Sequence, residues 1–299
     1  MRRNLKDDDP GKNSAAKAEH IPVLLKEMLS ELSPADGKTY FDGTFGGGGY
    51  TKAILDAANC KVIAADRDPR VKSTADEFKT DYRERFNFFS AKFSEIKKIA
   101  GEAKLDGVVL DLGVSTFQLA DPSRGFSFNL AGPVDMRMGS DGQTALSVIR
   151  EYSERDLANI IYEYGEERFS RRIAKNIKVN LGLIKTTEDL ANIIRRSARK
   201  TSKIDPATRT FQALRIFVND ELGELEKVLK DSVDLLNPGG KIVVASFHSL
   251  EDRIVKYFFK KLDPSKFKIL TKKPIVPSEE EISFNHKSRS AKLRAVHML

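Results

Sequence analysis

The chain has 299 residues, of which 40% are hydrophobic and 31% are charged, and its formal net charge at pH 7 is +8. This apolar content predicts a globular protein with one large or two modest domains. Because there is no run of eighteen apolar residues and no apolar segment behind Met1, the sequence argues against a membrane span and a signal peptide and favours a cytoplasmic protein.

The single cysteine and the four histidines set limits on metal and redox chemistry. Cys60 has no cysteine partner, so an internal disulfide is excluded. The histidines are scattered along the chain without metal-ligand spacing, and no metal site is therefore expected. The positive net charge is compatible with a polyanionic partner.

The chain begins with a polar, charged stretch over residues 1–18, which we interpret as a disordered leader. Apolar helices and strands then alternate as far as residue 112. The predicted helices are 22–32, 51–58, 71–81 and 93–100, and the predicted strands are 39–41, 62–65, 86–89 and 107–112. This alternation predicts an α/β domain with a parallel, doubly wound sheet.

The alternation is then interrupted. Residues 121–138 are loop-like, and residues 145–202 have the pattern of successive helices, with Ser153 and Asp156 as a capping box. One long helix (207–236), a turn (237–240) and strands at 241–247, 267–271 and 292–298 follow. The pattern predicts seven strands, with residues 19–125 and 206–299 forming one discontinuous domain and residues 126–205 an inserted helical domain.

A glycine-rich loop follows the first predicted strand. It has the sequence Asp42-Gly-Thr-Phe-Gly-Gly-Gly-Gly, and residues 46–49 are four consecutive glycines. Glycines such as Gly46, Gly48 and Gly49 let a backbone turn tightly and approach a ligand closely. Asp66 ends the second strand seventeen positions after Gly49, close to the ~20 residues that separate such loops from a ribose-binding carboxylate. A nucleotide cofactor is therefore predicted.

The acid in this loop discriminates between two classes of cofactor. Asp42 at the mouth of the loop suits a ligand with an ammonium and a sulfonium, and it would repel the pyrophosphate of a dinucleotide. The glycine spacing also lacks a clean dinucleotide fingerprint. S-adenosylmethionine is therefore favoured over NAD.

At this point the chain resembles the RsmH/MraW-type family of bacterial enzymes, which methylate N4 of a cytidine in small-subunit ribosomal RNA. The resemblance covers almost everything after the leader. The resembling blocks are His20-Ile-Pro-Val-Leu-Leu, Asp42-Gly-Thr-Phe-Gly-Gly-Gly-Gly, Asp66-Arg-Asp-Pro, Asp111-Leu-Gly-Val-Ser, Arg124-Gly-Phe-Ser-Phe, Asp135-Met-Arg-Met, Tyr164-Gly-Glu-Glu-Arg-Phe, Pro206-Ala-Thr-Arg-Thr-Phe, Ser246-Phe-His-Ser-Leu-Glu-Asp-Arg and Ser288-Arg-Ser-Ala-Lys-Leu-Arg. The resemblance implies a class I Rossmann-like methyltransferase fold.

The resemblance also implies contacts to the methyl donor. Gly48, Gly49 and Tyr50 would line its methionine end. Asp66 would bind the ribose, Phe93 would lie beside the adenine, and Asp111 and Gln118 would complete the pocket. Tyr50 departs from the histidine that is common in the family, and Phe117 replaces a proline. The Tyr50 hydroxyl can still donate a hydrogen bond, so a shifted contact is expected there.

The end of the fourth predicted strand offers candidates for the transfer itself. The exocyclic amine of cytosine is a poor nucleophile, so acceptors must hold its hydrogens while nitrogen attacks the methyl group. Asp111 and Ser115 suit this role, and Asp111 could equally anchor the donor's amino-acid end. His248 could orient the base. Alternatively, this segment simply begins a helix with Ser249 as N-cap. Phe126 and Phe128 could stack on a flipped base or pack in the core.

The inserted segment is strongly basic. Residues 168–203 contain eleven lysines and arginines against two acids, a net charge of +9. Such a segment beside a cofactor site favours nucleic acid as the partner. The candidate phosphate-binding residues are Arg171, Lys175, Arg195, Arg196, Arg199 and Arg209.

The sequence thus predicts a ribosomal RNA cytosine-N4 methyltransferase that uses S-adenosylmethionine and acts on small-subunit RNA or the assembled subunit. Two alternatives stay open: a methyltransferase for another nucleic acid or a small molecule, and a non-catalytic RNA-binding assembly factor. Whether the protein is a monomer or a homodimer also stays open.

Overall fold

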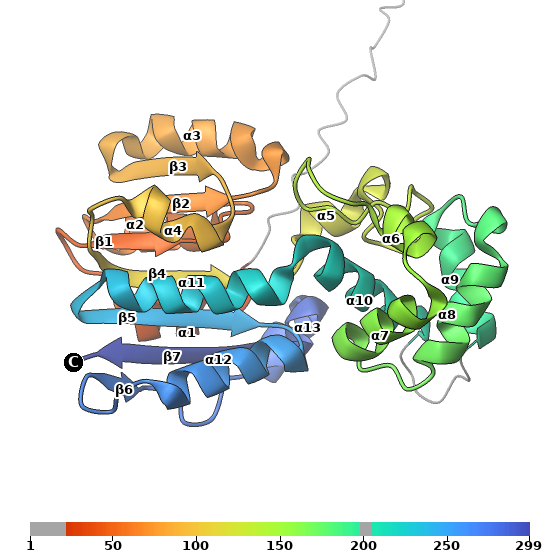
Figure 1. Cartoon of the computed structure of the whole chain (residues 1–299). Coiled ribbons are helices and arrows are strands. Elements are labelled where there is room, and N and C mark those ends of the chain that lie inside the picture. Colours follow the sequence, from red (N-terminus) through yellow and green to blue (C-terminus); the bar gives the residue numbers. More distant parts are fainter. Residues whose placement is uncertain (1–21, 198–204) are drawn as a thin grey trace, which may run out of the picture.

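Seven strands form one sheet in a computed structural model that describes residues 22–197 and 205–299 (Figure 1). The predicted leader 1–18 and Arg199 lie outside the described residues. The strands are β1 (Thr39–Asp42), β2 (Lys61–Asp66), β3 (Phe86–Ser90), β4 (Leu105–Asp111), β5 (Leu236–Ser246), β6 (Phe267–Ile269) and β7 (Lys292–Met298). Their order across the sheet is β3-β2-β1-β4-β5-β7-β6.

Strands β1 to β5 are parallel, and β7 runs antiparallel to both β5 and β6. The register pairs Asp42 with Ala64 and with Val109, and Asp111 with Ala245. The carboxyl ends of β1, β2, β4 and β5 therefore lie along one edge of the sheet, which is where parallel α/β sheets bind ligands.

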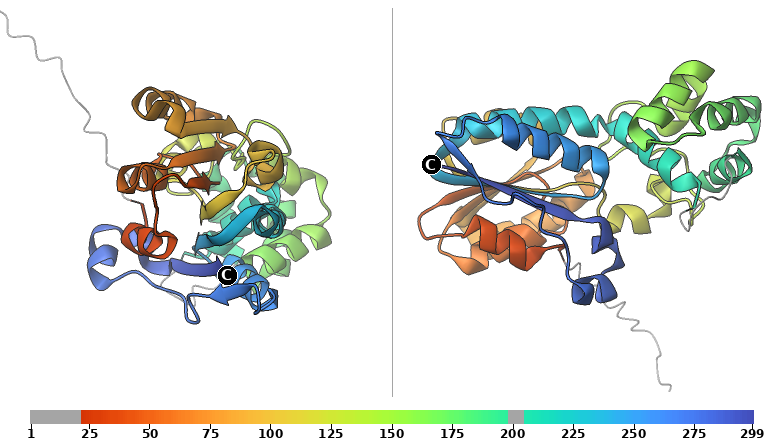
Figure 2. Two further views of the ribbon diagram at one scale, coloured as in Figure 1. Left: turned by 90° about the vertical axis from the view of Figure 1, so that its left-hand side faces the viewer. Right: turned by 90° about the horizontal axis from the view of Figure 1, so that it is seen from below.

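Helices cover both faces of the sheet, as the two views in Figure 2 show. One layer consists of α1 (Leu25–Leu32), α2 (Gly49–Ala57) and α3 (Lys72–Tyr82), and the other of α4 (Ile96–Ala100), α11 (Glu221–Leu235) and α12 (Ser249–Lys261). Neighbouring β4 residues point to opposite layers: Val109 packs with the first, and Val108 and Leu110 pack with the second. A strand that is buried on both faces has apolar residues at successive positions, which explains the sequence of β4.

The remaining helices form a second body beyond the carboxyl ends of the parallel strands (Figure 1). They are α5 (Thr116–Ala120), α6 (Ala145–Glu151), α7 (Glu154–Gly165), α8 (Ser170–Val179), α9 (Thr187–Ser197) and α10 (Ala207–Asn219). These helices share an apolar cluster of their own. The predicted class I Rossmann-like fold, with a seven-stranded, mostly parallel sheet and an inserted helical domain, is confirmed.

Short elements complete the described chain. They are α13 (Glu279–Phe284) and the 3-10 helices η1 (Pro69–Val71), η2 (Arg83–Arg85), η3 (Phe93–Glu95), η4 (Pro122–Arg124), η5 (Leu181–Leu183) and η6 (His286–Ser290). Ser153 is the N-cap of α7, as predicted, and its hydroxyl accepts a hydrogen bond from Asp156 N. None of the described helices is long and apolar enough to cross a bilayer.

The prediction of one helix over 207–236 is wrong. Asp220 adopts a left-handed conformation with φ 49°, and it separates α10 from α11. The adjacent Asn219 explains the break, because its side chain donates to Met136 O at 2.7 Å and accepts from Met138 N at 2.8 Å. Helix α10 accordingly packs with the inserted helices, so the packing changes from one core to the other at Asp220 and not at 205/206.

Two smaller predictions also differ from the structure. The predicted turn 237–240 belongs to β5, beside a register shift between Leu105 and Gly107 on β4. The N-cap of α12 is His248 and not Ser249, because the His248 side chain accepts from Glu251 N and the Glu251 carboxylate accepts from His248 N. Local sequence could not distinguish these neighbours, since both can cap a helix.

Candidate active site

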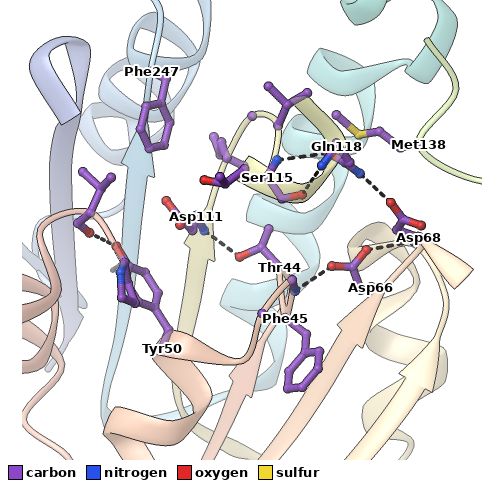
Figure 3. Close-up of a pocket in the computed structure, with 18 of the residues that line it drawn as sticks. Thr44, Phe45, Tyr50, Asp66, Asp68, Asp111, Ser115, Gln118, Met138 and Phe247 are labelled. Atoms are coloured by element: carbon purple, nitrogen blue, oxygen red, sulfur yellow. Dashed lines mark hydrogen bonds between the residues drawn. The ribbon is translucent and has the colours of Figure 1, made fainter. Parts of the chain in front are cut away.

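A cavity of about 440 Å³ lies at the carboxyl edge of the sheet (Figure 3). Three strand ends contribute to its wall: the loop after β1, the residues around Asp66 after β2, and the segment from Asp111 to Ser115 after β4. Phe93, the start of α11 and residues 284–287 complete the lining. The topology has therefore brought together segments that are far apart in sequence.

Asp42 holds the loop after β1 in place from the side of the loop that faces away from the cavity. This fully buried carboxylate accepts from Thr44 N at 3.0 Å and from the Thr51 hydroxyl at 2.7 Å. The Thr44 hydroxyl oxygen in turn accepts from Asp111 N at 2.7 Å. Burial raises the pKa of Asp42 despite these bonds. Asp42 does not line the cavity, so the structure corrects its expected place at the mouth of the loop.

The glycines of this loop serve two purposes. Gly46 and Gly48 have φ of 49° and 77°, in the left-handed region that glycine tolerates best. Gly46 and Gly49 line the cavity and Gly48 does not. A Cβ at Gly48 would lie 2.4 Å from the Phe78 ring, and one at Gly49 would lie 2.2 Å from Pro22 Cγ. Close protein packing thus requires glycine at 48 and 49, independently of any ligand.

Asp66 fixes the turn after β2 and faces the cavity. Its Oδ2 accepts from Gly46 N at 2.8 Å, and its Oδ1 accepts from Asp68 N at 2.8 Å. Burial raises the pKa of Asp66 to about 6. Each oxygen retains a second lone pair, so the carboxylate can still accept a ligand hydroxyl.

Asp111 is the least satisfied acid of the site. Its Oδ1 is buried and has no hydrogen-bond partner in the described part of the chain. Burial, followed by the nearby charges of Asp42 and Glu251, raises the pKa of Asp111 to about 8. A buried carboxylate without a donor is costly, and a cationic or hydrogen-bonding ligand would relieve that cost.

Two predicted cofactor residues already have partners within the protein. The Tyr50 hydroxyl donates to Val23 O at 2.5 Å, so only the ring of this cavity-lining residue is available to a ligand. The Gln118 amide accepts from Ser115 N at 3.0 Å and donates to Asp68 Oδ2 at 2.9 Å. Because the Ser115 hydroxyl oxygen accepts from Gln118 N, this pair caps α5 and fixes its start at the cavity.

His248 does not line the cavity, although its neighbours Phe247 and Glu251 do. Its Nδ1 accepts weakly from Glu251 N at 3.4 Å, and its Nε2 lies 3.2 Å from Glu251 Oε1. Burial would raise the pKa of Glu251, but His248 and the charge of Arg215 outweigh it and hold that pKa below its usual value. This geometry favours the capping role of His248 over contact with a substrate.

One histidine and two glutamates of the described residues come close enough to share a metal ion: Glu221, His248 and Glu251 have ligand atoms within 4.8 Å of one another. Arg215, however, donates to both Glu221 oxygens at 2.8 and 2.9 Å. A metal would have to compete with this guanidinium, and the absence of a metal stays a prediction.

Arg124, for which the sequence analysis predicted no role, links the cavity to the inserted domain. Its Nη1 donates to Asp68 Oδ2 at 2.7 Å, and its Nη2 donates to the carbonyls of Arg137 and Met138 at 2.9 and 2.8 Å. Both partners of the ion pair are largely buried. Arg124 belongs to the block Arg124-Gly-Phe-Ser-Phe, which resembles the family, and this was the only feature of the sequence that could have identified it.

The predicted RNA-binding residues fall into two groups. Arg171 and Lys175 on α8, Arg196 on α9 and Arg209 on α10 are exposed. Arg195, in contrast, donates to Asp205 at 2.9 Å and lies over the Phe128 ring. Arg195 is therefore held in a structural role.

The two aromatic residues that could have stacked on a flipped base belong to the core of the insertion. Phe126 is buried in its apolar cluster, and Phe128 packs edge-on against Phe211. Core packing, the alternative interpretation of these residues, is confirmed.

Comparison with known proteins places this geometry in a family. The family model of the MraW methylase family matches residues 17–299. The chain is 53% identical to ribosomal RNA small subunit methyltransferase H of Ehrlichia canis, over 93% of this chain and 99% of that protein. It is 50% identical to the protein of the same name from Rickettsia canadensis, over 92% and 96%. A solved rRNA methylase from Streptococcus thermophilus is similar with 10% identity and a TM-score of 0.45, over 91% and 93%. The chain belongs to the MraW methylase family and is a methyltransferase.

Proposed function

We propose that this protein transfers a methyl group from S-adenosylmethionine to the N4 amine of a cytidine in small-subunit ribosomal RNA, near the decoding site, and that it does so in the cytoplasm. The names of its relatives support the ribosomal substrate. The observation that carries the chemistry is the buried Oδ1 of Asp111, which has no hydrogen-bond partner among the described residues and lies at the edge where the strand ends meet.

The cavity fits the cofactor by its donor and acceptor groups. Asp111 offers a free acceptor to a cationic amino acid end, Asp66 keeps lone pairs for ribose hydroxyls, and Phe93 offers an apolar ring to the adenine. Gly46 and Gly49 contribute bare backbone, and Tyr50 contributes its ring. When bound, S-adenosylmethionine supplies an electrophilic methyl group on a sulfonium.

The protein's own task is to position a weak nucleophile. Asp111 ends β4 and Ser115 caps α5 four residues later, and both can accept hydrogen bonds from the target amine while its nitrogen attacks. The capping bonds between Ser115 and Gln118 hold that segment still. Asp111 is also suited to anchor the donor's ammonium, and substitution of Asp111 will separate the two roles through donor affinity.

The insertion supports RNA binding through charge. Arg171 and Lys175 lie four residues apart on α8 and share a face, and Arg196 and Arg209 add exposed cations on neighbouring helices. Arg199, in the segment outside the described residues, belongs to the same proposal.

The test is tritium transfer from labelled S-adenosylmethionine to small subunits that lack the modification, followed by nucleoside analysis. Naked small-subunit RNA, DNA and large subunits serve as matched substrates. N4-methylated cytidine formed only with small-subunit substrates is the expected result. Donor binding without transfer to any of them would support the non-catalytic assembly factor, and transfer to DNA alone would support a different nucleic-acid substrate.

A further inference from the structure

The segment from α13 into η6 closes one side of the cavity. Residues 284–287 contribute to the lining, although they are separated from the glycine loop by more than two hundred residues. In Figures 1 and 2, α13 lies at the carboxyl edge of the sheet, on the side that faces the insertion. The block Ser288-Arg-Ser-Ala-Lys-Leu-Arg continues directly from this segment.

The segment is anchored at both ends. Ser278 caps α13, and Glu281 Oε1 accepts from Leu24 N at 2.8 Å, which ties α13 to the start of α1. After η6 the chain enters β7, which pairs with β5 on one side and with β6 on the other. These contacts hold the segment in place at the mouth of the cavity.

Lys287 is the notable side chain of this segment. Its Nζ donates to the Thr116 hydroxyl at 3.1 Å, so it reaches from η6 to the start of α5 across the cavity lining. No carboxylate of the described residues forms an ion pair with it. Partial burial lowers the pKa of Lys287, which is the cost of holding a cation there with a neutral partner.

An aromatic side chain of the same segment also faces the cavity. Phe284 lines the cavity and is 58% exposed. Exposed aromatic rings beside an unpaired cation are the features with which proteins bind a single-stranded nucleotide, through base stacking and phosphate contact. Most other charges in the cavity wall are carboxylates, which would repel a phosphate.

We propose that Lys287 binds a phosphodiester of the RNA strand that enters the cavity, with Phe284 beside it as a stacking surface. This proposal rests on the proposed function, because it identifies where the acceptor strand passes. It assigns η6 and the start of α5 to the acceptor, and it leaves the glycine loop to the donor.

The test compares Lys287→Ala and Lys287→Arg with wild type. Binding to small subunits is measured between 50 and 300 mM salt, together with KM, kcat and the Kd for S-adenosylmethionine. Lys261→Ala is the matched control, because this exposed lysine ends α12 at the opposite edge of the sheet. Thr116→Val controls for the bridge itself, and thermal melting establishes that each variant is folded.

Lys287→Ala should raise the KM for subunits about three- to tenfold and reduce the slope of log K against log salt by about 0.7–0.9, as expected for one lost phosphate contact. Lys287→Arg and Lys261→Ala should keep the wild-type slope, and the donor Kd should not change. An unchanged slope in Lys287→Ala would overturn the proposal. A weaker donor Kd would instead place Lys287 on the donor's carboxylate, and an equal loss in Thr116→Val would reduce it to a brace for α5.

These outcomes are distinct from failure of the proposed function. If wild-type enzyme methylates no cytidine of the subunit, the proposed reaction is wrong, whatever the salt slopes are. If wild type methylates the subunit and Lys287→Ala behaves like Lys261→Ala, the reaction stands and the inference about Lys287 fails.

Discussion

The cavity wall and the outer surface of the insertion handle charge in opposite ways. Around the cavity, several charged groups are held in specific bonds, such as Arg124 with Asp68 and Arg215 with Glu221. On α8, Arg171 and Lys175 are exposed on a helical face. A small ligand must be held in one geometry, which requires preorganised side chains, whereas a phosphate backbone can be attracted by charge density alone. A single substitution should therefore cause a large loss of function at the cavity and a small loss of RNA affinity on the surface of the insertion.

Asp111→Asn should have the largest effect. It removes a cavity-lining carboxylate whose buried Oδ1 has no hydrogen-bond partner among the described residues, and we expect methyl transfer to fall about 10³-fold, a typical loss for a positioned catalytic group. Single-turnover methyl transfer and donor calorimetry measure this loss. Loss of transfer with unchanged donor affinity would assign Asp111 to the amine, and loss of both would assign it to the donor. Wild-type rates in Asp111→Asn would contradict its place in the site.

The same residue predicts a pH dependence. The pKa of Asp111 is about 8 in the folded protein, against an ordinary value of 3.8. Between these two values the carboxyl group of the folded protein keeps its proton, and the carboxylate forms only as the pH rises towards 8. A cationic donor binds the carboxylate, so its affinity should increase between pH 6 and 7.5 by up to about tenfold per pH unit. Calorimetry across this range checks the slope, which should be flat in Asp111→Asn. An equally steep slope in that variant would assign the titration to another group.

The link between the two regions should be the next most sensitive element. Arg124→Ala leaves the largely buried Asp68 carboxylate without its cation, and we expect the free energy of unfolding to fall by about 3 kcal/mol. Urea unfolding measures this loss. Asp68→Asn and the double variant complete a thermodynamic cycle, and additive losses would show that the two side chains do not interact.

Within the insertion, one structural and two surface cations provide a sharper comparison. Arg195→Ala should lower the free energy of unfolding by about 1 kcal/mol, because its ion pair with Asp205 is partly exposed and it also covers Phe128. Arg171→Ala and Lys175→Ala should leave stability unchanged and weaken RNA binding in a salt-dependent way. Urea unfolding and filter binding measure the two effects. If Arg195→Ala weakened RNA binding and the two surface variants lowered stability, exposure would not distinguish structural from RNA-binding cations.

The smallest effect is expected at a helix start that is remote from the cavity. Ser153→Ala removes the N-cap of α7 and should cost about 0.5–1 kcal/mol in unfolding free energy. The donor Kd should not change if the cavity is organised by the sheet domain alone. Calorimetry with this variant tests that independence, and a weaker Kd would show that the inserted core supports the cavity.

Much of the fold followed from local patterns because each pattern has one dominant physical cause. The β4 sequence, apolar at every position from Val108 to Leu110, is what a strand buried on both faces requires. Asp66 and Asp111 were found because acids at strand ends must face the carboxyl edge of the sheet. The break between α10 and α11 could not be predicted from the local sequence. It lies at Asp220, where the neighbouring Asn219 bonds to Met136 and Met138, more than eighty residues away.

The sequence alone determined the fold class, the glycine loop, the strand-end acids and the basic insertion, because these depend on residue type and spacing. The tertiary structure decided which candidates reach the cavity. It placed Asp42 behind the loop and His248 at a helix cap, and it used the Tyr50 hydroxyl for Val23. It also brought Lys287 to Thr116 from the far end of the chain. Contacts between distant segments depend on how whole layers pack, and no local pattern records them.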